Sequence, residues 1–194
     1  MKLLGLTGGI GMGKSTAAGF LLQQGIPVLD TDDLARELVL PGQPALAEIQ
    51  AAFGPTIISA DGVLDRSRLA ALVFKDAGAR RQLEAILHPR IRARWQSQAE
   101  LWRQENQRVG VVVIPLLFET QAETAFDRIL CLACTPASQQ QRLLARGWSA
   151  DQISRRLAAQ MPVNQKIHQS HYVIWSEGRT EVTAQQLARI LERV

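Results

Sequence analysis

A phosphate-binding loop near the amino terminus constrains this chain more than any other feature. Residues 8–15 read Gly-Gly-Ile-Gly-Met-Gly-Lys-Ser and match G-x-x-x-x-G-K-[ST], the Walker A or P-loop pattern, at every fixed position. The apolar run Leu3–Thr7 predicts a strand before the motif, and Lys14–Gln24 has helical spacing after it. Glycine-rich backbone at a helix start points its N–H groups at an anion. We therefore expect the chain to bind the phosphates of a nucleoside triphosphate.

Each part of this loop has an expected role. Lys14 carries a mobile charge to the β- and γ-phosphates, and the Ser15 hydroxyl is placed to bind Mg²⁺. The expected ATP-binding residues of the loop are Gly8, Gly9, Ile10, Gly11, Met12, Gly13, Lys14, Ser15 and Thr16. The motif thus predicts a nucleoside triphosphate and Mg²⁺ as ligands, and the family resemblance described below implies that the nucleotide is ATP.

The motif alone does not separate kinases from GTP switches or ATP-driven machines. A guanine-binding switch carries Asn-Lys-x-Asp after a strand, which neither residues 106–108 nor residues 164–166 supply. A mechanical ATPase needs a strong strand that ends in a carboxylate, whereas the strongest strand here ends Val-Val-Ile-Pro at residues 112–115. Both readings are disfavoured.

The order of apolar runs predicts an α/β fold with a doubly wound parallel sheet. A second strand, Ile26–Leu29, follows the first helix, and Val109–Ile114 has the valine-rich, non-alternating pattern of a strand buried on both faces. Ile129–Cys134 and Tyr172–Trp175 are the later strands. Helices are expected at 136–145, 150–160 and 181–193.

The intervening stretch reads as a helical insertion. Its expected helices are Leu34–Leu40, Pro44–Phe53, Arg66–Phe74, Ala77–Leu87 and Pro89–Gln104, with a turn at Asp61-Gly62 and a helix cap at Asp65. We expect a nucleotide-binding core of residues 1–32, 107–135 and 164–194, a helical acceptor-binding insertion of residues 33–106, and a lid of residues 136–163.

The composition of the chain limits where the protein is expected in the cell and which partners it is expected to bind. The chain has 194 residues and a net charge of +4, without a membrane-spanning apolar run or a signal peptide, so we expect a cytoplasmic protein that does not bind a membrane. Two arginine-dense stretches, 80–94 and 142–156, lack regularly interleaved aromatics, which disfavours nucleic acid. The C-x-x-C pair Cys131 and Cys134 lies in an apolar strand, so we interpret both as buried small hydrophobes rather than a redox or zinc site.

A carboxylate follows the second strand at Asp32. In open α/β sheets, ligands bind at the carboxyl ends of the strands, so this group is placed to accept the proton of an attacking hydroxyl or to hold Mg²⁺. The alternative is that Asp32 or Asp33 caps the next helix.

Arginines on two consecutive helices predict a mobile lid over phosphates. Arg142 and Arg146 are four residues apart and share a helix face, and Arg155 and Arg156 follow on the next helix. A lid excludes water, which protects ATP from hydrolysis. The alternative is an ordinary basic helical hairpin.

Across nearly its whole length the chain resembles the dephospho-coenzyme A kinase family. The resemblance is carried by Thr-Gly-Gly-Ile-Gly at residues 7–11, Asp-Thr-Asp at 30–32 with Arg36, Leu-Asp-Arg at 64–66, Leu-His-Pro at 87–89, Pro-Leu-Leu-Phe-Glu at 115–119, and Arg142, Arg146, Arg156 and Gln160.

The resemblance implies transfer of the ATP γ-phosphate to the ribose 3′-hydroxyl of dephospho-CoA. It implies Asp32 as the base, Lys14 as the γ-phosphate ligand, and Arg142 as the group that neutralises the transferring phosphate, with Arg146 beside ATP. The acceptor would be bound by Asp32, Arg36, Arg66, His88, Pro115, Leu116 and Leu117.

Two segments differ from the family pattern. Val113 and Ile114 stand where the family often has an acidic residue before Pro-Leu-Leu, and Trp175-Ser176 stands where it has an asparagine. Two other functions stay open from the residues: a kinase of another small acceptor, such as a nucleoside monophosphate, and a nucleotide-dependent switch without chemistry.

Overall fold

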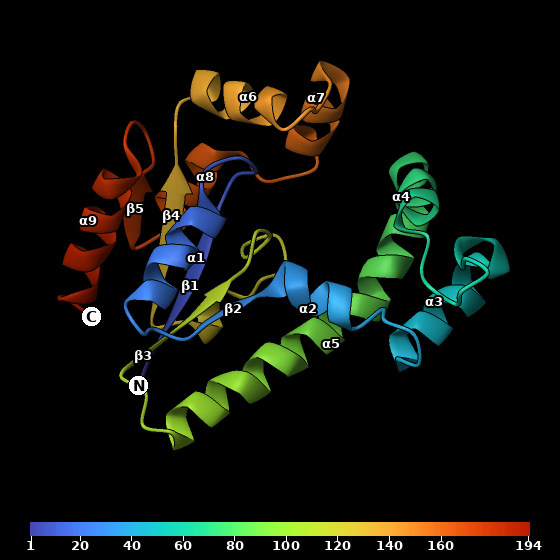
Figure 1. Cartoon of the computed structure of the whole chain (residues 1–194), viewed down its shortest axis with the longest axis horizontal. Coiled ribbons are helices and arrows are strands. Elements are labelled where there is room, and N and C mark those ends of the chain that lie inside the picture. The colour runs from blue at the N-terminus through green and yellow to red at the C-terminus, as the bar shows by residue number, and fades with distance from the viewer. The chain divides into compact units, whose positions relative to one another are not determined.

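A computed structural model describes every residue of the chain, from 1 to 194. The chain forms two compact units. The sheet unit comprises residues 1–30 and 99–194, and the helical unit comprises residues 31–98 (Figure 1). The predicted lid, residues 136–163, belongs to the sheet unit. That the helical unit binds the acceptor stays a prediction.

Five parallel strands form the sheet in the order β2-β3-β1-β4-β5. The strands are β1 (Lys2–Gly8), β2 (Val28–Asp30), β3 (Val109–Val113), β4 (Arg128–Ala133) and β5 (Tyr172–Trp175). Because all pairs are parallel, the carboxyl ends of the strands lie along one edge, which carries the P-loop after β1. This arrangement confirms the predicted α/β fold.

Apolar side chains hold the sheet unit together. Helices α1 (Lys14–Gln23) and α9 (Thr180–Leu191) pack against each other and share a core with β1, β3 and β4. Helix α8 (Val163–Gln169) packs against β4 and β1. A β-carbon on Gly110 would lie 2.5 Å from the Trp102 ring, so this strand position requires glycine.

The helical unit contains α2 (Thr31–Glu37), α3 (Pro44–Phe53), α4 (Arg66–Lys75) and most of α5 (Ala77–Gln104). Its small core consists of Val39, Leu46, Ile49, Ile57, Leu64 and Leu69. The predicted cap is confirmed, because the Asp65 carboxylate accepts the Ser67 and Arg68 N–H groups at 3.1 and 3.0 Å. Short 3₁₀ turns occur at Pro55–Ile57 and Glu123–Ala125.

The predicted break at Pro89 is wrong. Helix α5 runs through His88 and Pro89 without ending. Proline removes one backbone hydrogen bond, but Pro89 is exposed and Ile86 and Leu87 beside it pack on the helical core. Arg90 donates to the Ile86 carbonyl at 2.6 Å and pairs with Glu48 at 2.5 Å. Tertiary contacts thus outweigh the local penalty.

The bounds of other strands and helices also differ from those predicted. β2 starts two residues later than predicted, at Val28, and α2 begins at Thr31, so Asp32 lies in a first helical turn. Helix α8 was not predicted, because its seven residues lack a clear apolar stripe. The lid helices are α6 (Pro136–Ala145) and α7 (Ala150–Ala158).

Candidate active site

The P-loop has the backbone geometry that its glycines permit. Gly8 has φ +141° and Gly13, which precedes α1, has φ +90°. A β-carbon on Gly8 would lie 2.4 Å from the Leu132 carbonyl oxygen, so no other residue fits between β1 and β4. The loop ends at Gly13, directly at the amino-terminal end of α1, where the helix dipole favours an anion.

The Lys14 side chain folds back over this loop. Its Nζ donates to the carbonyl oxygens of Gly8 and Gly9 at 2.8 and 3.0 Å. The ammonium group therefore lies against the loop whose N–H groups form the expected phosphate cradle. Ser15 and Thr16 follow in the first turn of α1 and are exposed.

Two lid glutamines hold the peptide groups of Ile10. The Gln139 amide on α6 donates to the Ile10 carbonyl at 2.7 Å, and the Gln160 side-chain oxygen, just after α7, accepts the Ile10 N–H at 3.1 Å. Leu143 of α6 also contacts Gly11. The P-loop is thus connected to both ends of the lid by side-chain hydrogen bonds. Gln139 was not predicted to contact the loop.

A cavity of about 270 Å³ opens beside the P-loop, within the sheet unit. It brings together five of the predicted ATP-binding residues, Gly11, Gly13, Thr16, Arg142 and Arg146. The rest of its lining is Ser176, Gly178, Thr180 and Thr183, none of which was predicted as a binding residue. Their position after β5, at the same edge as the P-loop, is the signal that could have identified them.

Arg142 joins the lid to this cavity. Its guanidinium donates to the Ser176 hydroxyl at 3.1 Å and to the Ser176 carbonyl, and the same hydroxyl donates to the Met12 carbonyl at 3.0 Å. Residue 176 therefore connects α6 to the P-loop. That Arg142 also contacts a transferring phosphate stays a prediction.

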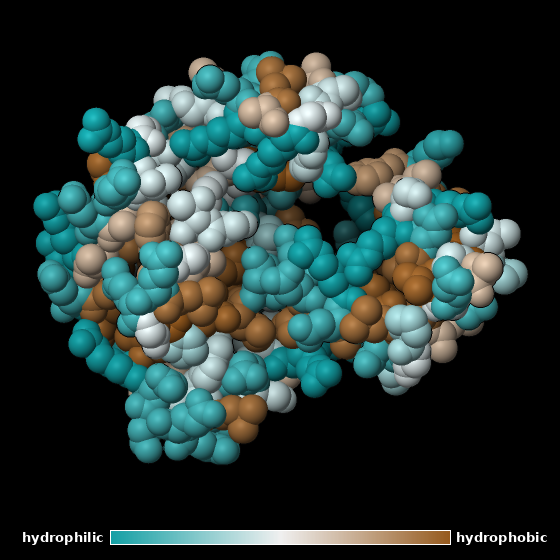
Figure 2. All heavy atoms as spheres, in the orientation of Figure 1, coloured by the Kyte–Doolittle hydropathy of each residue, from teal (hydrophilic) through white to brown (hydrophobic).

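The other lid arginines have partners inside the lid. Arg155 pairs with Asp151 one turn earlier on α7, and the Arg156 guanidinium stacks 4.4 Å from the Trp148 ring centroid. In Figure 2 the lid surface that faces the viewer carries both hydrophilic and hydrophobic side chains. Arg142 and Arg146 therefore line the cavity, whereas Arg155 pairs within α7 and Arg156 packs on Trp148 of the α6–α7 turn.

Glu177 secures the start of α6. Its carboxylate accepts the Thr135 N–H at 2.6 Å and the Ser138 hydroxyl at 2.7 Å. Hydrogen bonds from the hydroxyl and N–H of Thr135 and from Ser138, with the nearby Arg142 charge, lower the pKa of Glu177 from 4.5 to about 2. The ionised form thus fastens α6 to the loop after β5.

This shift predicts a pH-dependent contribution to stability. Because the folded pKa lies below the unfolded value, the contribution is full above pH 4.5 and is lost as the pH falls toward 2. We expect Glu177→Gln to unfold at a lower temperature than the wild type at pH 7, with a difference that shrinks across this window. Thermal unfolding at stepped pH measures it, with exposed Glu105→Gln as control; a pH-independent difference would contradict the assignment.

A second cavity lies within the helical unit. Its volume is about 270 Å³, and it brings Asp32 together with Arg36 and Arg66, three of the predicted acceptor residues. Its apolar wall consists of Ala35, Val39, Ile49, Leu64, Leu69 and Leu87. The Arg36 guanidinium donates to Asp33 at 2.5 Å, which directs it along the α2 surface. A carboxylate and two arginines over an apolar floor suit an anionic acceptor with a hydroxyl to deprotonate.

The remaining predicted residues lie elsewhere. His88 is half-buried in the middle of α5 and does not line this cavity, although its neighbour Leu87 does. Pro115, Leu116 and Leu117 follow β3 in the sheet unit, and Leu117 is fully buried against Gly5 of β1. The roles of these four residues toward the acceptor stay predictions.

The chain supplies few ligands for a metal ion. No group of three or more His, Cys, Asp or Glu side chains is arranged to hold one. The exposed Ser15 hydroxyl at the start of α1 is a hard oxygen donor and fits Mg²⁺, which commonly takes one or two protein ligands together with substrate phosphates.

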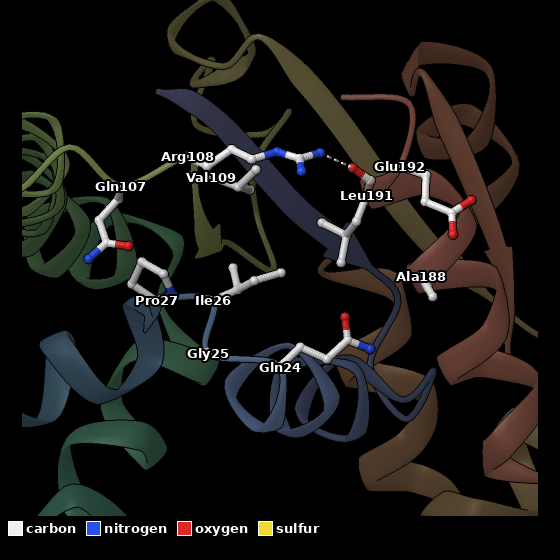
Figure 3. Close-up of a pocket in the computed structure, with 10 residues that line it drawn as sticks. All are labelled: Gln24, Gly25, Ile26, Pro27, Gln107, Arg108, Val109, Ala188, Leu191 and Glu192. Carbon is white, nitrogen blue, oxygen red and sulfur yellow. Dashed lines mark hydrogen bonds between the residues drawn. The ribbon is translucent and has the colours of Figure 1, made fainter.

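A third cavity, of about 440 Å³, lies away from these residues. It is lined by residues that precede β2 and β3 and by the end of α9, so it lies at the amino-terminal edge of the sheet, opposite the P-loop. Figure 3 shows the Arg108 side chain reaching toward the Leu191 carbonyl, to which it donates at 2.9 Å. This cavity is not part of the nucleotide site.

Two features outside the site were also anticipated. Cys131 and Cys134 are free and buried, as predicted, and burial raises the pKa of Cys131 to about 11, so its thiol stays protonated. None of the helices combines the length and the apolar character that spanning a bilayer requires.

Comparison with known proteins agrees with the geometry. The family model described as dephospho-CoA kinase matches residues 2–181. The dephospho-CoA kinase of Bdellovibrio bacteriovorus is 38% identical over 192 residues, 99% of this chain and 96% of that protein. That of Shouchella clausii is 42% identical over 185 residues, 95% of this chain and 94% of that protein.

Solved structures show the same fold. TT1252 from Thermus thermophilus has a TM-score of 0.83 and 35% identity, and the match covers 100% of this chain and 97% of that one. The dephospho-CoA kinase from Campylobacter jejuni has a TM-score of 0.73 at 22% identity, over 98% of this chain and 96% of that one. By its P-loop, its sheet order and its full-length similarity, the chain belongs to the dephospho-CoA kinase family.

Proposed function

We propose that the chain transfers the γ-phosphate of ATP to the ribose 3′-hydroxyl of dephospho-CoA, which gives coenzyme A and ADP. Full-length similarity to dephospho-CoA kinases supports the choice of substrates. The observation that carries the acceptor assignment is the cavity that groups Asp32 with Arg36 and Arg66. A cytoplasmic location belongs to the same proposal, since ATP is the donor.

On the donor side, the P-loop N–H groups and Lys14 bind the β- and γ-phosphates. The nucleoside occupies the cavity lined by Thr16, Ser176 and Thr183, which gives it contacts after β5 in place of the family asparagine. Ser15 would hold Mg²⁺, which supplies charge neutralisation between the phosphates. Arg142 and Arg146 balance the charge on the transferring group.

On the acceptor side, Arg36 and Arg66 bind anionic groups of dephospho-CoA by charge-assisted hydrogen bonds. Asp32 accepts the proton of the 3′-hydroxyl as that oxygen attacks the γ-phosphorus. The lid helices exclude water, so the hydroxyl rather than water is the nucleophile. His88 and residues 115–117 complete the acceptor site in this proposal.

An acceptor panel tests this function. Purified protein is mixed with ATP, Mg²⁺ and, in separate reactions, dephospho-CoA, AMP or shikimate, and ADP formation is followed. We expect turnover with dephospho-CoA alone. Coenzyme A, whose 3′-position is already phosphorylated, and a 3′-deoxy analogue of dephospho-CoA are matched controls that should give none. Turnover with the 3′-deoxy analogue would exclude the 3′-hydroxyl, and faster turnover with AMP would make the chain a kinase of another acceptor.

A further inference from the structure

Lys166 is the one charged residue that is completely buried. It lies on α8 with 0% exposure. Its Nζ donates to the Pro115 carbonyl at 2.6 Å and lies 2.8 and 3.1 Å from the two oxygens of Glu119. Both partners belong to the segment that follows β3. The ammonium group thus holds the two ends of residues 115–119.

The Pro115 carbonyl connects this segment to the start of the P-loop. Besides the Lys166 ammonium, it accepts the Thr7 hydroxyl at 3.3 Å. Thr7 is buried in β1 and directly precedes Gly8. One carbonyl oxygen therefore receives a hydrogen bond from the strand that carries the P-loop and another from Lys166.

Glu119 connects the same segment to the end of the lid. Its Oε1 accepts the Met161 N–H at 2.8 Å. Gln160, the preceding residue, accepts the Ile10 N–H of the P-loop at 3.1 Å. Residues 160 and 161 are consequently held from two sides, by the phosphate loop and by the carboxylate that Lys166 neutralises.

Stability alone gives no reason for an ion pair here. Removing an ammonium group from water is unfavourable, and well-packed apolar residues of similar size commonly stabilise a protein as much as a buried ion pair or more. A hydrogen-bonded ion pair is directional, whereas an apolar contact is not, so the ion pair fixes the positions of specific oxygen atoms. The oxygens fixed here are those of Pro115, beside the P-loop strand, and Glu119, beside the lid.

We propose that Lys166 is a positioning residue for phosphoryl transfer, which acts through Pro115 and Glu119 to align the P-loop, the segment after β3 and the end of the lid. The proposal rests on the kinase function proposed above. It assigns Lys166 no contact with either substrate. Small misplacements of supporting groups lower the rate of the chemical step more than they weaken ground-state binding.

The test is the double variant Lys166→Met with Glu119→Gln. Methionine replaces the lysine stem, glutamine keeps an oxygen for the Met161 N–H, and no uncompensated charge stays buried. We expect a melting temperature within a few degrees of the wild type, a kcat lowered about 10-fold or more, and a KM for ATP changed by less than about 3-fold. A merely structural role would change the melting temperature without this split between kcat and KM.

Ser170→Ala is the matched control, since the Ser170 hydroxyl donates to the Lys166 carbonyl at 2.7 Å and does not contact Pro115 or Glu119. We expect it to retain kcat. A folded double variant with kcat within about 2-fold of the wild type would overturn the proposal. If the double variant does not fold, Lys166→Gln with Glu119→Gln, which likewise leaves no charge buried, is judged by the same two criteria.

The acceptor preference of the wild-type protein tests the proposed function, and the variants test the positioning role of Lys166. All variants are assayed with the acceptor that the wild type turns over best. If that acceptor is not dephospho-CoA, the proposed function fails, whereas the fall in kcat of the Lys166 variant relative to the wild type still decides the positioning role.

Discussion

Lys14→Ala abolishes productive use of ATP, because it removes the mobile charge from the phosphate cradle. The Lys14 ammonium lies on the Gly8 and Gly9 carbonyls, directly over the loop. Loss of a preorganised charge at transferring phosphates typically costs about 100- to 1,000-fold in rate, and we expect at least that loss in kcat/KM for ATP. Steady-state kinetics with ATP and dephospho-CoA measure the loss, and calorimetry measures ATP binding.

Lys2→Ala is the matched control for this substitution. Lys2 also belongs to the sheet unit, at the opposite end of β1, where its side chain is half exposed and lies 4.0 Å from Asp127. The Lys2→Ala substitution removes the same charge far from the phosphate-binding loop, so we expect near-normal kinetics. Thermal unfolding establishes that both variants are folded. A folded Lys14→Ala protein with kcat/KM within about 3-fold of the wild type would remove Lys14 from the donor site.

Asp32→Asn has the second largest expected effect. Asparagine preserves the size of the side chain in the first turn of α2 but cannot accept the proton of the acceptor hydroxyl. General-base catalysis contributes about 10²- to 10⁴-fold, so we expect kcat to fall by that factor. The KM for ATP should stay close to that of the wild type, because the P-loop and its cavity are unchanged.

Asp33→Asn provides the comparison for this carboxylate. Asp33 is the adjacent carboxylate, is also exposed, and pairs with Arg36 at 2.5 Å. Losing that pair removes the contact that orients Arg36, so Arg36 should bind the acceptor less well. We therefore expect a raised KM for dephospho-CoA and a kcat within a few-fold of the wild type. If Asp32→Asn keeps a near-normal kcat, Asp32 is not the base. If Asp33→Asn instead shows the large loss, the proton acceptor is one residue further along α2.

Much of the fold is local enough to be predicted from sequence patterns. The P-loop turn depends on contiguous glycines between a strand and a helix, and helices Pro44–Phe53 and Pro136–Ala145 were predicted with the observed bounds. The patterns failed where distant contacts compete with local preference. Pro89 predicts a helix end, but packing of its neighbours on the helical core carries α5 through it.

The candidate site likewise has residues that the sequence predicts and residues that only the folded structure brings together. The sequence by itself determined the phosphate loop, because the residues that bend its backbone and carry its charge are consecutive, from Gly8 to Ser15. The end of the second strand also marked Asp32, the family resemblance added Arg36 and Arg66, and the helical unit brings all three to one cavity.

Only the tertiary structure decided what surrounds that loop. Parallel pairing in the order β2-β3-β1-β4-β5 places the loop after β5 beside the P-loop, which adds Ser176 and Thr183 to the cavity there. The same packing buries Lys166 against Glu119, 47 residues earlier in the chain. No local pattern predicts such pairs, because their free energy depends on desolvation and geometry that exist only once the sheet has formed.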